Sequence, residues 1–227
     1  LDASMRPLAF QLLRELSHEH FVSGVQLAEK FGVSRSAVSD ALHDASEAGV
    51  DIFSLTRRGY RLAEPVELLS LERIRRELGA ATNRLDVDLV ESTGSTNSDL
   101  MQRAMSGAPS GSCLVTEIQT AGRGRRGRVW QSAFGASLTF SLLWRFEKGA
   151  AHLGGLSLVV GLAVLRALRA CGVTSPEVVL KWPNDILAGH RKLAGVLIES
   201  QGDMLGPTMA VIGIGINVNL PDTLREA

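Results

Sequence analysis

The sequence contains few cysteines and has no net charge. Two cysteines, Cys113 and Cys171, occur among 227 residues, far apart and without metal-ligand spacing. This pattern excludes a disulfide-rich scaffold and a zinc site, and it favours a reduced, cytoplasmic protein. Since 24 Lys and Arg balance 24 Asp and Glu, any contact with nucleic acid or a membrane has to be local.

The sequence also lacks an apolar run long enough to cross a membrane, and we expect no membrane partner. The first apolar stretch, Leu8 to Leu13, is too short and too polar for a signal peptide. The longest, Leu153 to Leu165, contains three glycines and is followed by Arg166, and we expect it to form a buried core helix. With 45% apolar residues, the chain can build one large or two small hydrophobic cores.

The most distinctive stretch runs from Gln119 to Trp130 and interleaves three glycines with four arginines. Glycine lets backbone amides approach a ligand, and each arginine can pair with two oxygens of a phosphate or carboxylate. The stretch therefore predicts a loop that wraps around an anion. Because four like charges repel one another, we expect the loop to order fully only when a polyanion is bound.

Three other interpretations fit the same residues. A basic run can be a nucleic-acid patch or a localisation signal. The spacing Gly122-x-Gly124-x-x-Gly127 matches a dinucleotide fingerprint, but that motif requires a following helix, and the β-like run Ala136 to Trp144 follows instead. A disordered Arg-Gly segment of the RNA-binding kind would require repeats, and the sequence has a single copy.

The N-terminal region has the pattern of a winged helix-turn-helix. Apolar spacing and capping residues predict three helices, at Pro7 to Leu16, at Gly24 to Phe31, and from the N-cap Ser34 to Leu42. A hairpin is predicted to follow, with strands at Asp51 to Leu55 and Tyr60 to Leu62. The residues expected to contact DNA lie at the start of the third helix and at the hairpin tip, namely Ser34, Arg35, Ser36, Ser39, Arg57 and Arg58.

The charge balance of this region argues against DNA binding. Up to Glu64 there are seven basic and nine acidic residues, and Asp40 and Asp44 lie on the helix that is expected to enter the groove. A winged helix that serves packing or protein contact is therefore the alternative.

Glu64-Pro65 marks a domain boundary, because the residue before a proline is driven out of the helical conformation. We expect a DNA-binding domain over residues 1–64 and a linker over residues 65–84, which contains an amphipathic helix from Ser70 to Gly79. A second domain then covers residues 85–227 and begins with the alternating strand Leu85 to Val90.

Polar residues crowd the start of a helix early in the second domain. Ser95, Thr96 and Asn97 belong to a run with more hydroxyls and amides than one helix cap needs, which predicts a neutral polar pocket as readily as capping. Gln119 ends the next predicted strand at the base of the arginine-rich loop. Its amide can both donate and accept, as recognition of an amide or urea group requires.

Charged residues interrupt the apolar strands further along the chain. Lys181 and Lys192 adjoin apolar runs, where an unpaired ammonium is costly, so we expect each to face an anion. Asn184 and Asp185 offer oxygens that could hold Mg²⁺ on a phosphate, and Asn217 could complete such a site. A plain turn flanked by solvated lysines is the alternative.

Five motifs, in this order, resemble those of biotin protein ligases. They are Ser95-Thr96-Asn97, Gly122 to Arg128 with Trp130, Lys181-Trp182-Pro183-Asn184-Asp185, Arg191-Lys192-Leu193-Ala194-Gly195, and Gly213-x-Gly215-x-Asn217. With the winged helix in front of them, the chain is similar to the bifunctional form of the family, which is both biotin ligase and biotin operon repressor.

The resemblance implies an α+β fold, in which a mixed-sheet catalytic domain similar to class II aminoacyl-tRNA synthetases follows the winged helix-turn-helix. It implies activation of biotin by ATP and Mg²⁺ to biotinyl-5′-adenylate, and transfer to a lysine of a biotin carboxyl carrier protein. The adenylate-bound homodimer would bind operator DNA and repress biotin genes. The SH3-like C-terminal β-barrel of the family is expected to be absent, since the sequence ends at Ala227.

The resemblance also assigns roles to residues. Lys192, Arg125 and Arg123 are the expected catalytic residues, because their charges would offset the repulsion between a carboxylate and a phosphate, and Asp185 is the expected metal ligand. The residues expected to contact biotin are Ser95, Thr96, Asn97, Gln119, Gly122, Arg123, Gly124, Arg125, Lys192 and Gly195. Those expected to contact ATP are Arg125, Arg128, Trp130, Lys181, Asn184 and Asn217.

Two other functions remain as alternatives. One is a biotin-responsive DNA-binding regulator whose second domain senses biotin without ligating it. The other is a lipoate or octanoyl transferase of similar fold, against which the arginine-rich loop argues.

Overall fold

The computed structural model describes residues 5–132 and 134–218. The chain divides between Leu68 and Leu69 into two compact units, and Phe134 and Gly135 group with the first unit. The helix expected in the linker therefore belongs to the second unit.

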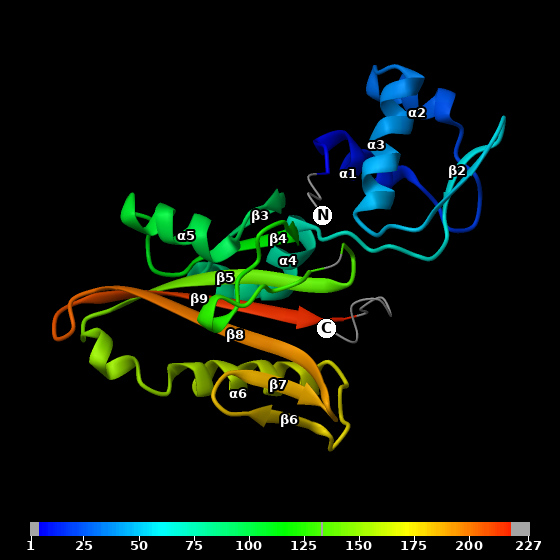
Figure 1. The fold of residues 1–227 in the computed structure, drawn as a ribbon. Helices are drawn as coiled ribbons and strands as arrows, with labels where there is room; N and C mark the ends of the chain where they lie inside the picture. The colour runs from blue at the N-terminus through cyan, green and yellow to red at the C-terminus, as the bar shows by residue number, and fades with distance from the viewer. Residues whose placement is uncertain (1–4, 133, 219–227) are drawn as a thin grey trace. The chain divides into compact units, whose positions relative to one another are not determined.

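The first unit is a winged helix-turn-helix, as the sequence predicted. Its elements, shown in blue to cyan in Figure 1, are α1 (Pro7–Glu15), α2 (Gly24–Phe31), α3 (Arg35–Glu47), β1 (Ile52–Leu55) and β2 (Gly59–Leu62). Ser34 caps α3, since its hydroxyl accepts a hydrogen bond from the amide of Ala37 at 3.1 Å. Gly32 ends α2 in the left-handed conformation with φ 64°, which allows the tight turn between the two helices.

The core of this unit is formed by one face of each helix. Phe10 of α1 and Val38 of α3 are fully buried, and Phe134 packs edge-on against Phe10 with ring centroids 5.6 Å apart. Val22 adds a β-bridge to Tyr60 of β2. This bridge connects the wing to the segment between α1 and α2.

The second unit is built on a seven-stranded mixed sheet with the order β3-β4-β5-β9-β8-β7-β6. Only β3 and β4 pair in parallel; the other neighbours are antiparallel. Its elements are α4 (Leu71–Leu78), β3 (Asp86–Thr93), α5 (Thr96–Met105), β4 (Ser112–Gln119), β5 (Ser137–Phe146), α6 (Leu156–Ala170), β6 (Val178–Lys181), β7 (Asp185–Ala188), β8 (Arg191–Gly202) and β9 (Thr208–Asn217), with 3₁₀ turns at Gly79–Asn83, Arg125–Gly127 and Ala150–Leu153.

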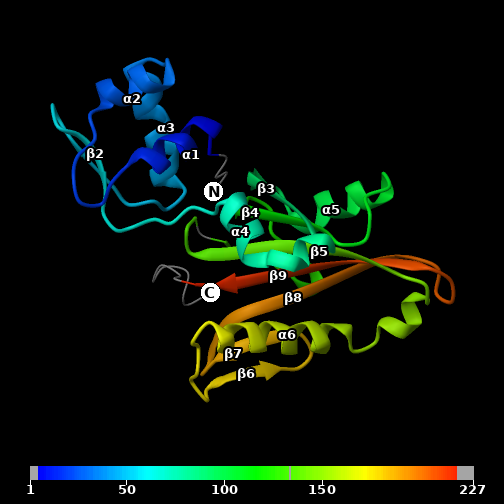
Figure 2. The same ribbon diagram turned by 180° about the vertical axis from the view of Figure 1, so that it is seen from behind.

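The helices α5 and α6 lie on opposite sides of the sheet, as the two views in Figures 1 and 2 show. Alternate residues of a strand point to opposite faces, so each strand contributes to two cores. Leu143 and Val211 pack with Leu100 of α5 on one face, and Ile212 packs with Val164 of α6 on the other. Burial of each such side chain stabilises the fold by about 1.5–3 kcal/mol. We call the face that carries α5 the α5 face.

The long apolar helix is less buried than the sequence suggested. Residues 150–170 have the length and apolarity of a membrane span, alone among the described helices. Within the unit, α6 contacts β6 and β8, with Val164 and Leu165 turned inward and buried. Val159 and Leu162 on its outer side are 65% and 44% exposed. The expectation of a buried helix is therefore right for only one side of α6.

Candidate functional site

Glycines form a floor on the α5 face of the sheet. Gly195 of β8 lies directly opposite Gly215 of β9. Gly213 precedes Gly215 by two residues on β9 and therefore lies on the same face. A Cβ at Gly213 would overlap the amide of Asn97, and one at Gly215 would overlap the indole of Trp130. Glycine is required here because other groups pack directly onto the backbone.

The indole of Trp130 lies on the pair Gly195 and Gly215. The ammonium of Lys192 is 5.5 Å from the centre of its ring, which is cation–π distance. The indole Nε1 is buried without a hydrogen-bond partner among the described residues. The same holds for the hydroxyl of Thr139, a residue of β5 that lies opposite Gly215 of β9. Buried polar atoms are rarely left unpaired, so this part of the floor offers hydrogen bonds to a ligand or to water.

The polar run at the start of α5 is buried beside the floor. Thr96 and Asn97 are 2% and 3% exposed, and Ser95 caps the helix. Gln119 Oε1 accepts hydrogen bonds from the backbone N–H of Thr96 at 2.8 Å and from its hydroxyl at 3.0 Å. Ser141 Oγ on β5 lies 2.7 Å from Thr96 Oγ1 and 2.6 Å from Asn97 Oδ1. These residues thus cap α5 and also form a polar wall beside the glycine floor.

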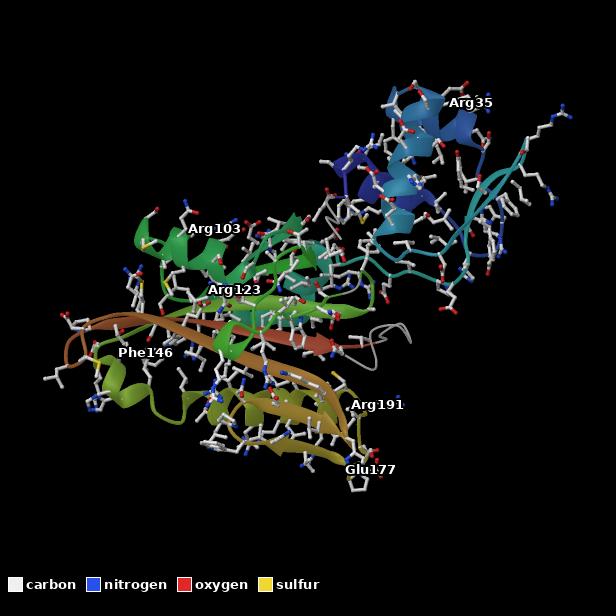
Figure 3. All side chains as sticks on the ribbon, viewed as in Figure 1. Arg35, Arg103, Arg123, Phe146, Glu177 and Arg191 are labelled. Atoms are coloured by element: carbon white, nitrogen blue, oxygen red, sulfur yellow. The ribbon has the colours of Figure 1, made fainter. Side chains whose placement is uncertain are left out.

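The arginine-rich loop folds back on itself as a small hairpin. Arg123 and Val129 form a β-bridge, and the amide of Trp130 donates to the carbonyl of Gly122 at 2.9 Å. The loop is held to the sheet by two side-chain contacts. Arg123 NH2 lies 3.0 Å from Glu199 Oε2, and Arg125 NH1 donates to Asn184 Oδ1 at 3.1 Å. Figure 3 labels Arg123 over the middle of the sheet.

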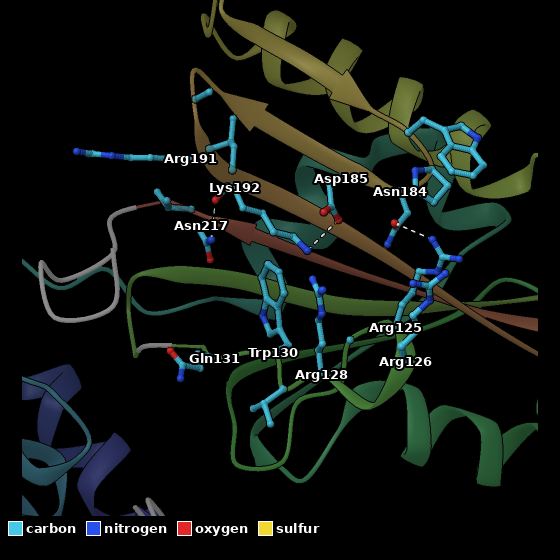
Figure 4. A pocket seen from close by; sticks show the side chains of 17 residues that line it. Arg125, Arg126, Arg128, Trp130, Gln131, Asn184, Asp185, Arg191, Lys192 and Asn217 are labelled. Atoms are coloured by element: carbon cyan, nitrogen blue, oxygen red, sulfur yellow. Dashed lines mark hydrogen bonds and ion pairs between the residues drawn. The ribbon is translucent and has the colours of Figure 1, made fainter. Parts of the chain in front are cut away.

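Lys192 reaches this face because of a β-bulge. The register between β7 and β8 shifts so that Leu187 pairs with Lys192 while Ile186 pairs with Ala194, which skips Leu193. The bulge turns Leu193 toward the opposite core and leaves Lys192 on the α5 face. Its Nζ lies 2.8 Å from Asp185 Oδ1, and Figure 4 shows this ion pair beside Trp130.

Two adjacent cavities lie along this face. The smaller, of about 50 Å³, is lined by the α5 cap, Gln119 and the glycine floor, and the larger, of about 870 Å³, lies under the arginine-rich loop beside β7 and β8. Five residues line both cavities, namely Gly124, Arg125, Trp130, Asn184 and Lys192. Groups bound in the two cavities would therefore meet at Arg125 and Lys192.

Most of the residues expected to bind a ligand line one of these cavities. Ser95, Thr96, Asn97, Gln119, Arg123 and Gly195 line the smaller, and Arg128, Asp185 and Asn217 line the larger. Gly122 packs against Trp130, and Lys181 lies opposite Asp185 on β6, but neither lines a cavity.

Sequence reasoning missed several residues that complete the site. Ser141 and Thr139 lie on the polar side of β5, and Glu199 on β8 contacts both Asn97 and Arg123. The alternation Ser137-x-Thr139-x-Ser141 in an otherwise apolar strand was a signal for the first two. Glu199 gave no local signal, since its partners lie far away in the sequence.

In the first unit, the six residues expected to contact DNA are all exposed: Ser34, Arg35, Ser36, Ser39, Arg57 and Arg58. The acidic character of α3 is smaller than the sequence indicated. Arg6 forms two hydrogen bonds to the carboxylate of Asp44, at 2.5 and 3.1 Å, and this contact lowers the pKa of Asp44. The charge of Asp44 is thus compensated within the unit.

Comparison with known proteins extends these observations. Residues 89–217 match the biotin/lipoate A/B protein ligase family, and residues 9–61 match an HTH domain. The chain is 42% identical over 207 residues to the bifunctional ligase/repressor BirA of Salmonella typhimurium, covering 91% of this chain and 62% of that protein. It is 32% identical over 234 residues to BirA of Bacillus subtilis, covering 100% of this chain and 70% of that protein.

A solved structure also resembles part of the chain. Biotin protein ligase from Leishmania major in complex with biotinyl-5-AMP matches with a TM-score of 0.50 and 31% identity, over 60% of this chain and 58% of that one. The chain spans less than two thirds of the length of the Salmonella relative, at 62%. The family match nevertheless covers most of the sheet and every strand that carries the site. The chain therefore belongs to the biotin/lipoate A/B protein ligase family.

Proposed function

We propose that the second unit activates biotin with ATP and transfers it to a lysine of a biotin carboxyl carrier protein. The observation that carries this proposal is the pair of cavities joined at Arg125 and Lys192. Adenylation requires a carboxylate and a triphosphate to come together, and a junction lined by two cationic side chains suits that encounter.

The smaller cavity would take biotin. Gln119 uses its Oε1 on Thr96, and its Nε2 points toward Gly122. Its amide therefore has donors left for a ligand, which suits the carbonyl oxygen of the ureido ring. Ser95 and Thr96 complete the polar end, and Gly195 provides the floor for the ring and its tail.

At about 50 Å³, the smaller cavity has too little space for biotin, since pockets for small ligands are generally 300–1,000 Å³. The indole of Trp130 is the mobile group that would give way, since it lies on the floor and is carried by a loop. We expect the indole to leave the glycine pair as the ligand enters. It would then cover the ligand or the adenine base from above.

The larger cavity would take the nucleotide. Arg128, Asn184 and Asn217 line it, and Lys181 of β6 pairs in register with Asp185 of β7, which also lines it. Among the described residues no group of three or more His, Cys, Asp or Glu could hold a metal by itself. A single carboxylate, Asp185, together with phosphate oxygens fits the way Mg²⁺ is bound in nucleotide sites. Bound there, Mg²⁺ would neutralise charge on the departing pyrophosphate.

The residues of this chain would act mainly by holding positive charge beside the reacting carboxylate and phosphate. A carboxylate oxygen of biotin attacks the α-phosphorus of ATP, and the bond to the bridging oxygen breaks as pyrophosphate leaves. Arg125 and Lys192 would reduce the repulsion between the two anions and follow the charge as it moves. In the second step the lysine amine of the carrier attacks the acyl carbon, AMP leaves, and a proton is released.

For the first unit we propose operator binding by a ligand-promoted homodimer. The supporting observations are the exposed residues at the start of α3 and at the wing tip, and the compensation of Asp44 by Arg6. Two copies would present two recognition helices to a palindromic site. The free thiols of Cys113 and Cys171 suit a reduced, cytoplasmic location.

Biotin-dependent exchange of labelled pyrophosphate into ATP tests the proposal. We expect exchange with biotin and Mg²⁺, and none when biotin is omitted. Exchange with lipoate in place of biotin would overturn the substrate assignment. No exchange at all would favour a regulator that binds biotin without activating it. Sedimentation velocity with biotin and ATP tests the dimer, since an unchanged coefficient would contradict it.

A further inference from the structure

Glu199 connects the buried polar cluster to the arginine-rich loop. Its Oε2 accepts a hydrogen bond from Asn97 Nδ2 at 2.8 Å and from Arg123 NH2 at 3.0 Å. Asn97 is 3% exposed, whereas the side chains of Arg123 and Glu199 are 48% and 32% exposed. One carboxylate oxygen thus joins a residue of the core to a residue of the loop.

These contacts close a ring that begins and ends in the same segment of chain. Gln119 stands at the base of the loop and Arg123 lies within it, four residues later. Polar contacts of hydrogen-bond length link the two in the order Gln119, Thr96, Ser141, Asn97, Glu199 and Arg123, and the first of them is the backbone N–H of Thr96 donating to Gln119. The middle of this network is buried, at Thr96, Ser141 and Asn97. A buried polar network rigidifies what it connects, because breaking one member leaves another unpaired.

Exposed ion pairs usually contribute little, since water screens them and both side chains lose freedom. The pair between Glu199 and Arg123 differs because Asn97 already holds the carboxylate from the buried side. Asn97 in turn is fixed, with Oδ1 against Ser141 and Nδ2 directed at Glu199. The loop therefore meets an acceptor whose position does not depend on the loop.

The ion pair with Glu199 distinguishes Arg123 from the other three arginines of the loop. Arg123 is matched by a carboxylate, whereas Arg125 donates to the neutral oxygen of Asn184 and forms no ion pair with another described residue. Within the described part of the chain, Arg126 and Arg128 form no ion pair. Three of the four guanidiniums thus keep an uncompensated charge for a ligand, and Arg123 does not.

We propose that Glu199 is a positioning residue that anchors the arginine-rich loop, with Arg123 as the anchor point on the loop. In this arrangement Arg123 acts through Glu199, while Arg125 and Arg128 meet the carboxylate and phosphate groups of the ligands. Asn97 has both ends of its amide engaged by the protein, so it serves the same anchor. The inference relies on the proposed function for the identity of the ligand only; the anchoring itself concerns the free protein.

Limited trypsin digestion without ligand tests the anchor directly, since the loop contains four cleavage sites. We expect Glu199→Ala and Glu199→Gln to be cleaved within residues 122–130 at least fivefold faster than the parent chain. Glu199→Gln keeps an acceptor for Asn97, so its fold should persist. Glu147→Gln, which changes an exposed carboxylate away from the loop, is the control and should be cleaved at the parent rate. Equal cleavage of the parent chain and both Glu199 variants would overturn the proposal.

A double-mutant cycle separates anchoring from direct contact with the ligand. If Arg123 acts through Glu199, then Arg123→Ala, Glu199→Ala and the double variant should weaken biotin binding by similar factors. If Arg123 itself binds the ligand, Glu199→Ala should free its guanidinium for that contact. The effects of the two single substitutions on biotin binding should then multiply or oppose each other. That second result would overturn the role given to Arg123. Failure of the parent chain to bind biotin would contradict the proposed function, and the trypsin result would still decide the anchor.

Discussion

Gly195 and Gly215 lie directly opposite each other on β8 and β9, and the indole of Trp130 rests on the flat surface that they form. A Cβ at Gly215 would overlap the indole, and one at Gly195 would crowd both Lys192 and the indole. The absence of two Cβ atoms therefore allows Trp130 to lie directly on the sheet.

The substitution Gly215→Ala tests this floor. We expect biotin affinity to fall by about tenfold or more, because the added methyl group overlaps the indole and the ligand space, and distortions of this size cost about 1–3 kcal/mol. Isothermal calorimetry measures the affinity. Gly154→Ala is the matched control, since a Cβ at Gly154 meets no atom within 4 Å. Parent-like binding by Gly215→Ala would show that the ligand lies elsewhere.

The cationic junction predicts a loss of catalysis without a loss of fold. Lys192→Ala and Arg125→Ala should each reduce biotin-dependent pyrophosphate exchange by about 10²–10³-fold, because each removes charge that stabilises the transition state. Circular dichroism should stay unchanged. Lys148→Ala, at an exposed lysine that lines neither cavity, should retain full activity. Near-normal exchange in both site variants would contradict the assignment.

The two cysteines should react at different rates with a thiol reagent. Burial raises the pKa of Cys113 from 9.0 to about 11, while Cys171 is exposed. A thiol reagent at pH 8 should therefore modify Cys171 quickly and the partly buried Cys113 much more slowly. Mass spectrometry of the modified peptides measures this, with Cys171→Ser as the control. Rapid labelling of both thiols in the folded protein would be inconsistent with the burial of Cys113.

The same shift makes a small contribution to the pH dependence of stability. The folded pKa of Cys113 lies above the unfolded value, so its contribution is fully present below pH 9 and is lost as the pH rises toward 11. Cys113→Ala should remove this part of the alkaline decline in urea unfolding. An identical decline in the variant would show that other groups cause it.

The wing should contribute phosphate contacts. Arg58 is exposed and its guanidinium lies 5.8 Å from the ring of Phe21. We expect Arg58→Ala to reduce the salt dependence of binding to a random-sequence duplex by a slope of about one, as loss of one phosphate contact should. Fluorescence anisotropy at several salt concentrations measures the slope. Arg103→Ala, which changes an arginine paired with Asp88 in the second unit, should leave the slope unchanged.

Features that depend on neighbouring residues in the sequence were predictable. The cap at Ser34, the three helices and the hairpin of the first unit follow from local chemistry, and the structure confirms them. The sequence also predicted that residues of five separate motifs lie close together, and the structure brings most of them to two adjacent cavities. The matching family is consistent with that reading.

Features that depend on distant partners were not predictable. Asp44 pairs with Arg6, which lies 38 residues away, and a count of charges along the sequence does not show which charges are paired. The bulge that turns Lys192 toward the site arises from pairing with β7. Glu199 is important through Asn97 and Arg123, which are 102 and 76 residues away.

The place of β9 at the centre of the sheet has a consequence for synthesis of the chain. This strand lies between β5 and β8, although it follows both in the sequence. Until the ribosome has released residues 208–217, β5 and β8 each present an unpaired edge, and such edges invite pairing with other chains. A nascent polypeptide paused before this strand should therefore bind chaperones strongly. The chaperones should dissociate when β9 pairs with β5 and β8 and completes the sheet.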